Sequence, residues 1–136
     1  MAETLLEIDG IETCYGLSQV LFGLSLKVRS GEMVALMGRN GMGKTTTIRY
    51  IMGLTPARAG TVRFGGQEVR SLPSYKIAQL GIGLVPEGRQ IFPNLTVYEN
   101  LVAASGNRQG ARDPWTIEKI HALFPRLAER SSNMGV

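Results

Sequence analysis

The run Gly38-Arg39-Asn40-Gly41-Met42-Gly43-Lys44-Thr45-Thr46 carries the residue types that a polyphosphate site needs. Glycines let the main chain turn tightly, so that successive N–H groups point inward and form an anion-binding nest. A helix that begins here adds unpaired N–H groups and about half a positive charge. The pattern Gly-x-x-x-x-Gly-Lys-Thr is the Walker A motif, or P-loop. It predicts that this chain binds a nucleoside triphosphate.

The polar side chains of this run have separate expected roles. Lys44 is expected to contact the β- and γ-phosphates, and the Thr45 hydroxyl is expected to hold Mg²⁺. Thr46, at the helix start, is assigned to the α-phosphate. The predicted nucleotide-binding residues of the run are Gly38, Arg39, Asn40, Gly41, Met42, Gly43, Lys44, Thr45 and Thr46.

This motif requires a strand before it and a helix after it. The apolar residues 33–37 are expected to form a buried parallel strand, and residues 45–52 the helix. Residues 82–85 are expected to form a second buried strand, which Pro86 ends. The polar residues 87–90 would then lie at the carboxyl edge of the sheet, where ligands bind in open α/β folds.

Periodicity predicts an antiparallel sheet in the rest of the first half. Apolar residues alternate in part over 5–11 and over 20–28, and residues 60–66 are typical of a short strand that runs into a turn. Residues 73–80 are expected to form a short helix that Gly81 closes.

Two more helices are predicted in the second half. Residues 96–99 match a capping box, which predicts a helix over 97–104. Asp113 and Pro114 are expected to be the N-cap and first residue of the last helix, after a polar linker at 106–112. The apolar stripe of that helix is expected to lie in the core and consists of Trp115, Ile120, Leu123, Phe124 and Leu127.

Composition indicates one globular domain. The chain has 136 residues, 43% of them hydrophobic and 19% charged, which is enough to bury a core. The formal charge of +4 comes from scattered Lys and Arg with no basic run, so a nucleic-acid surface is not indicated. The single Cys14 fits a reducing compartment. No apolar stretch approaches the ~20 residues that cross a bilayer.

Two aromatic residues leave alternatives open. Tyr15 lies in a loop before the motif and is either a partly buried aromatic at a strand end or a stacking platform for an adenine ring. His121 lies within the apolar stripe and is a packing or surface histidine, because nothing in the sequence offers it a metal or catalytic partner.

Hydrolysis by a P-loop enzyme needs a second strand that ends in Asp and a group that orients water. The chain has two aspartates, Asp9 and Asp113, and neither follows an apolar strand. We therefore expect this chain to be the front part of a longer enzyme.

The motifs together resemble the ATP-binding subunit of ABC transporters along essentially the whole length. The resemblance rests on the aromatic loop at Tyr15, the P-loop, the strand 60–62 and the segments 85–87 and 95–101. Residues 85–97, with Pro-Glu-Gly-Arg where most of these ATPases have a glutamine, are similar to the bacterial importers of branched-chain amino acids. Importers of urea and short amides look similar.

This resemblance implies an α/β fold. It has a P-loop nucleotide-binding core with an antiparallel β subdomain and the start of a helical subdomain, an incomplete ABC ATPase domain. The β subdomain and core would occupy about 1–93, and the helical part about 94–136.

The resemblance also implies ligands and roles. The cofactors would be ATP and Mg²⁺. Tyr15 would stack on adenine, residues 40–46 would wrap the phosphates, and Glu87 would take the catalytic Q-loop position near Mg²⁺ and the attacking water. The alternative for Glu87 is a solvated loop glutamate. A carboxylate only accepts hydrogen bonds, whereas glutamine also donates them.

Partners and location follow from the same resemblance. The partners would be integral-membrane permease subunits and a second ATPase subunit. The residues from about 94 onward would receive the permease. The chain would lie at the cytoplasmic face of the bacterial inner membrane, as a peripheral protein. The family's signature sequence, Asp-Glu strand end and switch histidine are absent, so we expect this chain to bind ATP weakly and not to hydrolyse it.

Two other functions stay open: a soluble ABC-type ATPase without a membrane partner, and a non-catalytic nucleotide-binding fragment. A GTPase is disfavoured because its guanine-reading Asn-Lys-x-Asp does not occur. A small kinase is less favoured, since it would need acceptor-binding arginines around the P-loop.

Overall fold

The computed structural model describes residues 3–15, 18–56, 58–88, 90–106 and 110–135. The chain forms two compact units, Met1–Leu84 and Val85–Val136, called here the first and the second unit. The expected boundary near residue 93 separates the β subdomain and core from the helical subdomain. The division into two compact units does not test that boundary, which stays a prediction.

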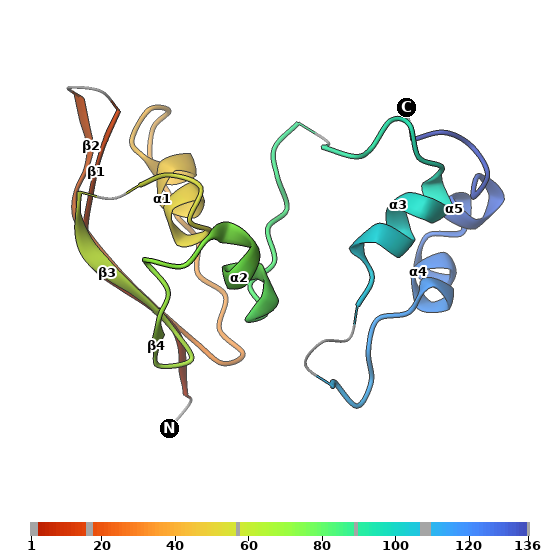
Figure 1. Ribbon diagram of the computed structural model, residues 1–136, viewed down its shortest axis with the longest axis horizontal. Helices are drawn as coiled ribbons and strands as arrows, with labels where there is room; N and C mark the ends of the chain where they lie inside the picture. The colour runs from red at the N-terminus through yellow and green to blue at the C-terminus, as the bar shows by residue number, and fades with distance from the viewer. Residues whose placement is uncertain (1–2, 16–17, 57, 89, 107–109, 136) are drawn as a thin grey trace. The chain divides into compact units, whose positions relative to one another are not determined.

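An antiparallel sheet forms the framework of the first unit (Figure 1). Its strand order is β2-β1-β3-β4, so that β1 pairs with both β2 and β3. The sheet confirms the strands expected near 5–11, 20–28 and 60–66, and the first two extend further than predicted. The strands are β1 (Thr4–Tyr15), β2 (Ser18–Arg29), β3 (Ala59–Phe64) and β4 (Gln67–Glu68).

Two helices, α1 (Lys44–Ile51) and α2 (Ser74–Gln79), pack with this sheet. Ile8 of β1 lies opposite Leu26 of β2 and Val62 of β3, and its side chain is buried. Each fully buried side chain of this kind contributes about 1.5–3 kcal/mol. The buried core of the first unit consists of Ile8, Ile11, Leu21, Tyr50, Ile51, Val62, Val69 and Ile77.

The close approach of β3 to β1 depends on Gly60. A Cβ atom at this position would lie 2.5 Å from the Ile11 Cα and 2.6 Å from the Gly10 carbonyl oxygen. Its φ of +95° is also one that other residues rarely adopt. No side chain fits here without moving the main chain.

The two expected parallel strands, at 33–37 and 82–85, are wrong. Both segments lack regular secondary structure, and Met33 and Met37 are 96% and 90% exposed. Val85 is 94% exposed. A parallel strand needs hydrogen-bonded neighbours and cover on both faces. No strand among the described residues pairs with either segment.

The second unit contains helices α3 (Val97–Ala104), α4 (Ile117–Leu123) and α5 (Pro125–Glu129). The capping box at the start of α3 is confirmed. The Thr96 hydroxyl accepts a hydrogen bond from the Glu99 N–H at 3.2 Å, and the Glu99 carboxylate accepts one from the Thr96 N–H at 2.8 Å. These bonds satisfy main-chain donors that the helix itself leaves unpaired.

The expected helix start at Asp113 is wrong, because Thr116 is the N-cap and α4 begins at Ile117. The Asp113 carboxylate instead forms an ion pair with the Lys119 ammonium group. Pro125 then ends α4 and becomes the first residue of α5, since a residue before proline avoids the helical region.

The expected apolar stripe is therefore split between two helices and is not a buried core. Trp115 is 70% exposed, Leu123 58% and Phe124 53%. Three of the five side chains that periodicity assigned to an interior face of one helix are thus mostly exposed, whereas Ile120 and Leu127 are half-buried.

Candidate nucleotide-binding site

The P-loop turns into α1 through two glycines in the left-handed region. Gly41 has a φ of +83° and Gly43 a φ of +84°, values that favour glycine. A Cβ atom on Gly43 would lie 2.5 Å from the buried Leu21 Cδ2 and 3.3 Å from the Val20 carbonyl oxygen. The motif glycines thus supply both a turn and a tight contact with β2.

The Lys44 side chain crosses the P-loop and is held there by main-chain carbonyl groups. Its ammonium nitrogen donates hydrogen bonds to the carbonyl oxygens of Gly38 at 2.7 Å and Arg39 at 2.9 Å. An ammonium group has three N–H donors, so a third remains for a phosphate oxygen. The two bonds fix the lysine beside the main-chain turn, and both are expected to bind the phosphates.

The N-terminus of α1 is suited to an anion. Its N-cap, Gly43, has no side chain, and its first turn contains no acidic residue. Thr47 anchors the turn from the other side, because its N–H and hydroxyl both donate to the Gly43 carbonyl oxygen, at 2.8 and 2.9 Å. Exposed N–H groups and the helix dipole favour negative charge here. The residues present therefore fit a polyphosphate.

The sequence did not single out Thr47, which is 1% exposed. The two threonines that precede it differ in their exposure to solvent. Thr45 is exposed, as a Mg²⁺ ligand must be, whereas Thr46 is 7% exposed. The signal that could have identified Thr47 is its position four residues after Gly43, where a hydroxyl bonds back to a helix carbonyl.

The structure places the other predicted site residues as follows. The main chain of Tyr15 ends β1 opposite Ser18, and residues 16 and 17 of the predicted aromatic loop lie outside the described residues. Arg39, Asn40 and Met42 are exposed in the P-loop. Glu87 is exposed in a turn of the second unit. Its role at Mg²⁺, like the adenine contact of Tyr15, stays a prediction.

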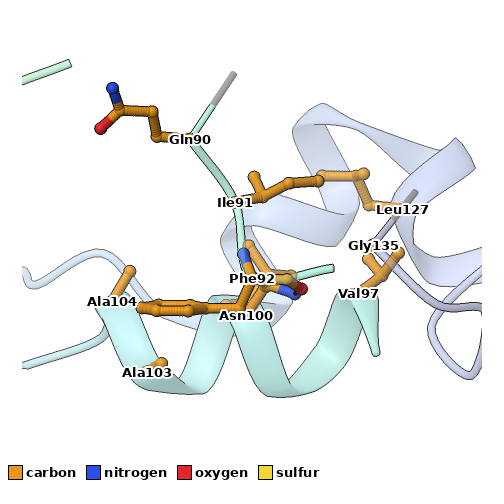
Figure 2. Close-up of a pocket in the computed structure, with 10 residues that line it drawn as sticks. Gln90, Ile91, Phe92, Val97, Asn100, Ala103, Ala104, Leu127 and Gly135 are labelled. Carbon is orange, nitrogen blue, oxygen red and sulfur yellow. Dashed lines mark hydrogen bonds between the residues drawn. The ribbon is translucent and has the colours of Figure 1, made fainter. Parts of the chain in front are cut away.

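A mostly apolar pocket of about 440 Å³ lies in the second unit (Figure 2). Figure 2 shows Ile91 and Phe92 on the chain that passes above α3, with Leu127 across from them. Sequence reasoning expected a partner surface from about residue 94 but did not predict a pocket. Its walls are formed by Gln90, Ile91, Phe92, Val97, Asn100, Leu101, Ala103, Ala104, Leu127 and Gly135.

The described part of the chain has neither a membrane-spanning helix nor a cluster of metal ligands. None of its helices has the length and apolar character to span a bilayer. It also contains no group of three or more His, Cys, Asp and Glu residues placed to hold a metal ion. A Mg²⁺ site built on Thr45 would rely on phosphate oxygens and water, which is how proteins commonly bind this ion with a nucleotide.

Residues 21–134 match the family description "ABC transporter". The match includes the P-loop, α1 and all three helices of the second unit. The chain belongs to the ABC transporter family. The resemblance inferred from the motifs is confirmed.

Relatives of this ABC transporter chain include proteins with different printed roles. It is 41% identical over 128 residues to the high-affinity branched-chain amino acid transport ATP-binding protein BraG of Pseudomonas aeruginosa, a match that covers 93% of this chain and 54% of the relative. It is 40% identical over 134 residues to the lipopolysaccharide export system ATP-binding protein LptB of Haemophilus influenzae, with 97% and 56% covered. The chain spans about half the length of these curated relatives.

The fold of this ABC transporter chain is also similar to a solved structure of the ATP-binding subunit of an ABC transporter. The TM-score is 0.73 and the identity 32%, with 96% of this chain and 54% of that chain covered. The predicted fold class, an incomplete ABC ATPase domain with an antiparallel β subdomain, is confirmed.

Proposed function

We propose that this chain is the ATP-binding part of an ABC importer that couples ATP to the uptake of branched-chain amino acids. The observation that carries the proposal is the Lys44 ammonium group, fixed at the uncapped start of α1 by the Gly38 and Arg39 carbonyl oxygens. The 41% identity to the BraG protein supports the substrate class. Because LptB is nearly as similar, the substrate needs its own test.

In this proposal the residues Gly38 to Thr46 bind the phosphates and Tyr15 stacks on adenine. ATP, when bound, supplies a hydrolysable phosphoanhydride. Lys44 supplies a charge-assisted contact, the Thr45 hydroxyl is a ligand of Mg²⁺, and Glu87 takes the Q-loop role. The 136-residue chain binds ATP but does not hydrolyse it.

The partner surface in this proposal is the pocket of the second unit. Its wall begins at Gln90, three residues after Glu87. Ile91 and Phe92 are 53% and 58% exposed, and exposed apolar patches of this kind mark interaction sites. We assign to it an apolar side chain from an amphipathic helix of a membrane permease. A second ATPase subunit and a location at the cytoplasmic face of the membrane belong to the same proposal.

Nucleotide binding is tested by titration calorimetry of the chain with ATP and Mg²⁺, alongside a phosphate-release assay. We expect binding without phosphate release. Release that Lys44→Ala abolishes would contradict the non-hydrolytic part of the proposal. ATP affinity that is unchanged in Lys44→Ala would contradict the P-loop assignment itself.

The transport role is tested with the complete gene product and its permease subunits in liposomes. We expect ATP-dependent uptake of labelled leucine, isoleucine and valine. Uptake of urea or a short amide instead would assign the chain to that importer class. ATP turnover that does not depend on the permease would favour a soluble ABC-type ATPase.

A further inference from the structure

The side chain of Asn100 in α3 makes a paired contact with the main chain of Phe92. Its amide oxygen accepts a hydrogen bond from the Phe92 N–H at 2.9 Å, and its amide nitrogen donates to the Phe92 carbonyl oxygen at 3.0 Å. The two bonds together copy the way one strand residue pairs with another. Phe92 is therefore fixed to α3 although it lies eight residues away in a segment without regular structure.

The same amide group reaches two further carbonyl oxygens, those of Leu95 at 3.3 Å and Thr96 at 3.0 Å. An Asn side chain has two N–H donors and one acceptor oxygen, so the group is fully engaged. The Asn100 side chain thus adds to the main-chain bond from the Leu95 N–H to the Phe92 carbonyl oxygen at 3.2 Å in closing the turn that joins Phe92 to α3.

A third segment, at Gly135 near the C-terminal end of the second unit, packs against this amide group. The Gly135 N–H donates to the Leu95 carbonyl oxygen at 2.9 Å. A Cβ atom on Gly135 would lie 2.9 Å from both the Asn100 Nδ2 and the Phe92 carbonyl oxygen. A methyl group at this position must push apart the groups that Asn100 joins.

Phe92, Asn100 and Gly135 all line the pocket, so the network forms part of its wall (Figure 2). We propose that Asn100 is the positioning residue of this pocket: its amide fixes the Phe92 main chain and thereby keeps the pocket in the shape that receives an apolar side chain. This inference rests on the proposed function, which makes the pocket the docking place for a permease helix.

The test uses indole as a probe for an apolar aromatic side chain, titrated into the 136-residue chain and followed by the NMR shifts of Leu101 and Leu127. The test variants are Asn100→Ala, which removes the amide, and Gly135→Ala, which leaves Asn100 in place but crowds it. The matched control is Asn94→Ala, since the exposed Asn94 side chain makes no hydrogen bond to any described residue.

We expect the wild-type chain and Asn94→Ala to bind indole with the same Kd, and both test variants to bind it about tenfold more weakly. Amide exchange at Phe92 should be slow in the wild type and fast in Asn100→Ala. Affinity for ATP should stay unchanged in all variants, because none of the three substituted residues belongs to the proposed nucleotide site.

A folding check uses the Phe124 N–H, which donates to the Ile120 carbonyl oxygen at 2.8 Å within α4. If Asn100→Ala loses protection there, Gly135→Ala decides the test. Indole binding at the wild-type Kd in a folded test variant would overturn the role of Asn100 and leave the proposed function standing. No indole binding by the wild type would overturn the pocket as a docking place, and this inference with it.

Discussion

The Lys44 ammonium nitrogen lies 2.7 Å from the carbonyl oxygen of Gly38, the first residue of the P-loop motif. This bond and its companion to Arg39 join the two ends of the loop. These two bonds restrict the main-chain conformations that are open to the loop. Lys44 thus acts on the loop as well as on the phosphates.

Replacing Lys44 with Ala should weaken ATP binding by about 1.5–3 kcal/mol, or roughly 10- to 150-fold, because a charge-assisted phosphate contact is lost. It should also speed amide exchange in the loop. Titration calorimetry and hydrogen exchange measure the two effects. The control is Lys76→Ala, which removes a lysine that lies 5.7 Å from the Tyr75 ring centre in α2. A comparable loss in both variants would point to a general charge effect.

Replacing Tyr15 with Ala should weaken ATP by about 1–3 kcal/mol, the range for a base that stacks on an aromatic ring. Pyrophosphate binding should be nearly unaffected, because that ligand has no base. Calorimetric titrations with both ligands separate the outcomes, and Tyr75→Ala on the exposed face of α2 is the control. Equal loss for both ligands would assign Tyr15 to packing.

Replacing Gly60 with Ala should destabilise the first unit by about 3–5 kcal/mol, the upper range for single substitutions. The added methyl group would meet the Ile11 main chain at 2.5 Å. Gly65→Ala is the matched control, because Gly65 also has a positive φ but open space around it. It should cost only about 1–2 kcal/mol. Urea unfolding measures both, and equal midpoints would show that the contact with β1 is unimportant.

The capping box of α3 should make the second unit sensitive to acid. Hydrogen bonds from the Thr96 N–H, and then from its hydroxyl group, lower the pKa of Glu99 below its ordinary value of 4.5. A lowered folded-state pKa gives stability that is present above pH 4.5 and is lost as the pH falls through the folded value.

The melting temperature should therefore fall less between pH 6 and about pH 3.5 in Glu99→Gln than in the wild type. If the melting temperatures of Glu99→Gln and the wild type depended on pH in the same way, the capping box would not be the source of the acid sensitivity.

Local signals predicted those elements whose stabilising groups are close in sequence. Thr96 and Glu99 form the expected capping box, and α1 begins at Lys44, one residue before the expected start. The antiparallel hairpin was predicted because β1 and β2 are neighbours in sequence. In each case the partner that stabilises the element lies within the same stretch of chain.

Predictions that depended on distant partners were wrong. The apolar residues around Met33 and Val85 have the composition of buried strands, but no described strand pairs with them. The apolar periodicity from Ile120 to Leu127 predicted one continuous helix, but Pro125 ends α4 and begins α5. The contact between Asn100 and Phe92 could not be predicted, because an Asn in a helix gives no sign of which main-chain groups it will reach.

The segment that contains the P-loop lies between β2, which ends at Arg29, and β3, which begins at Ala59. Both of these strands pair with β1. A protease that cleaves at the exposed Met33 would therefore sever the covalent chain without releasing either piece. The same arrangement allows fragment complementation: two peptides, one that carries β1 and β2 and one that carries the loop, α1 and β3, could reassemble the nucleotide site when mixed.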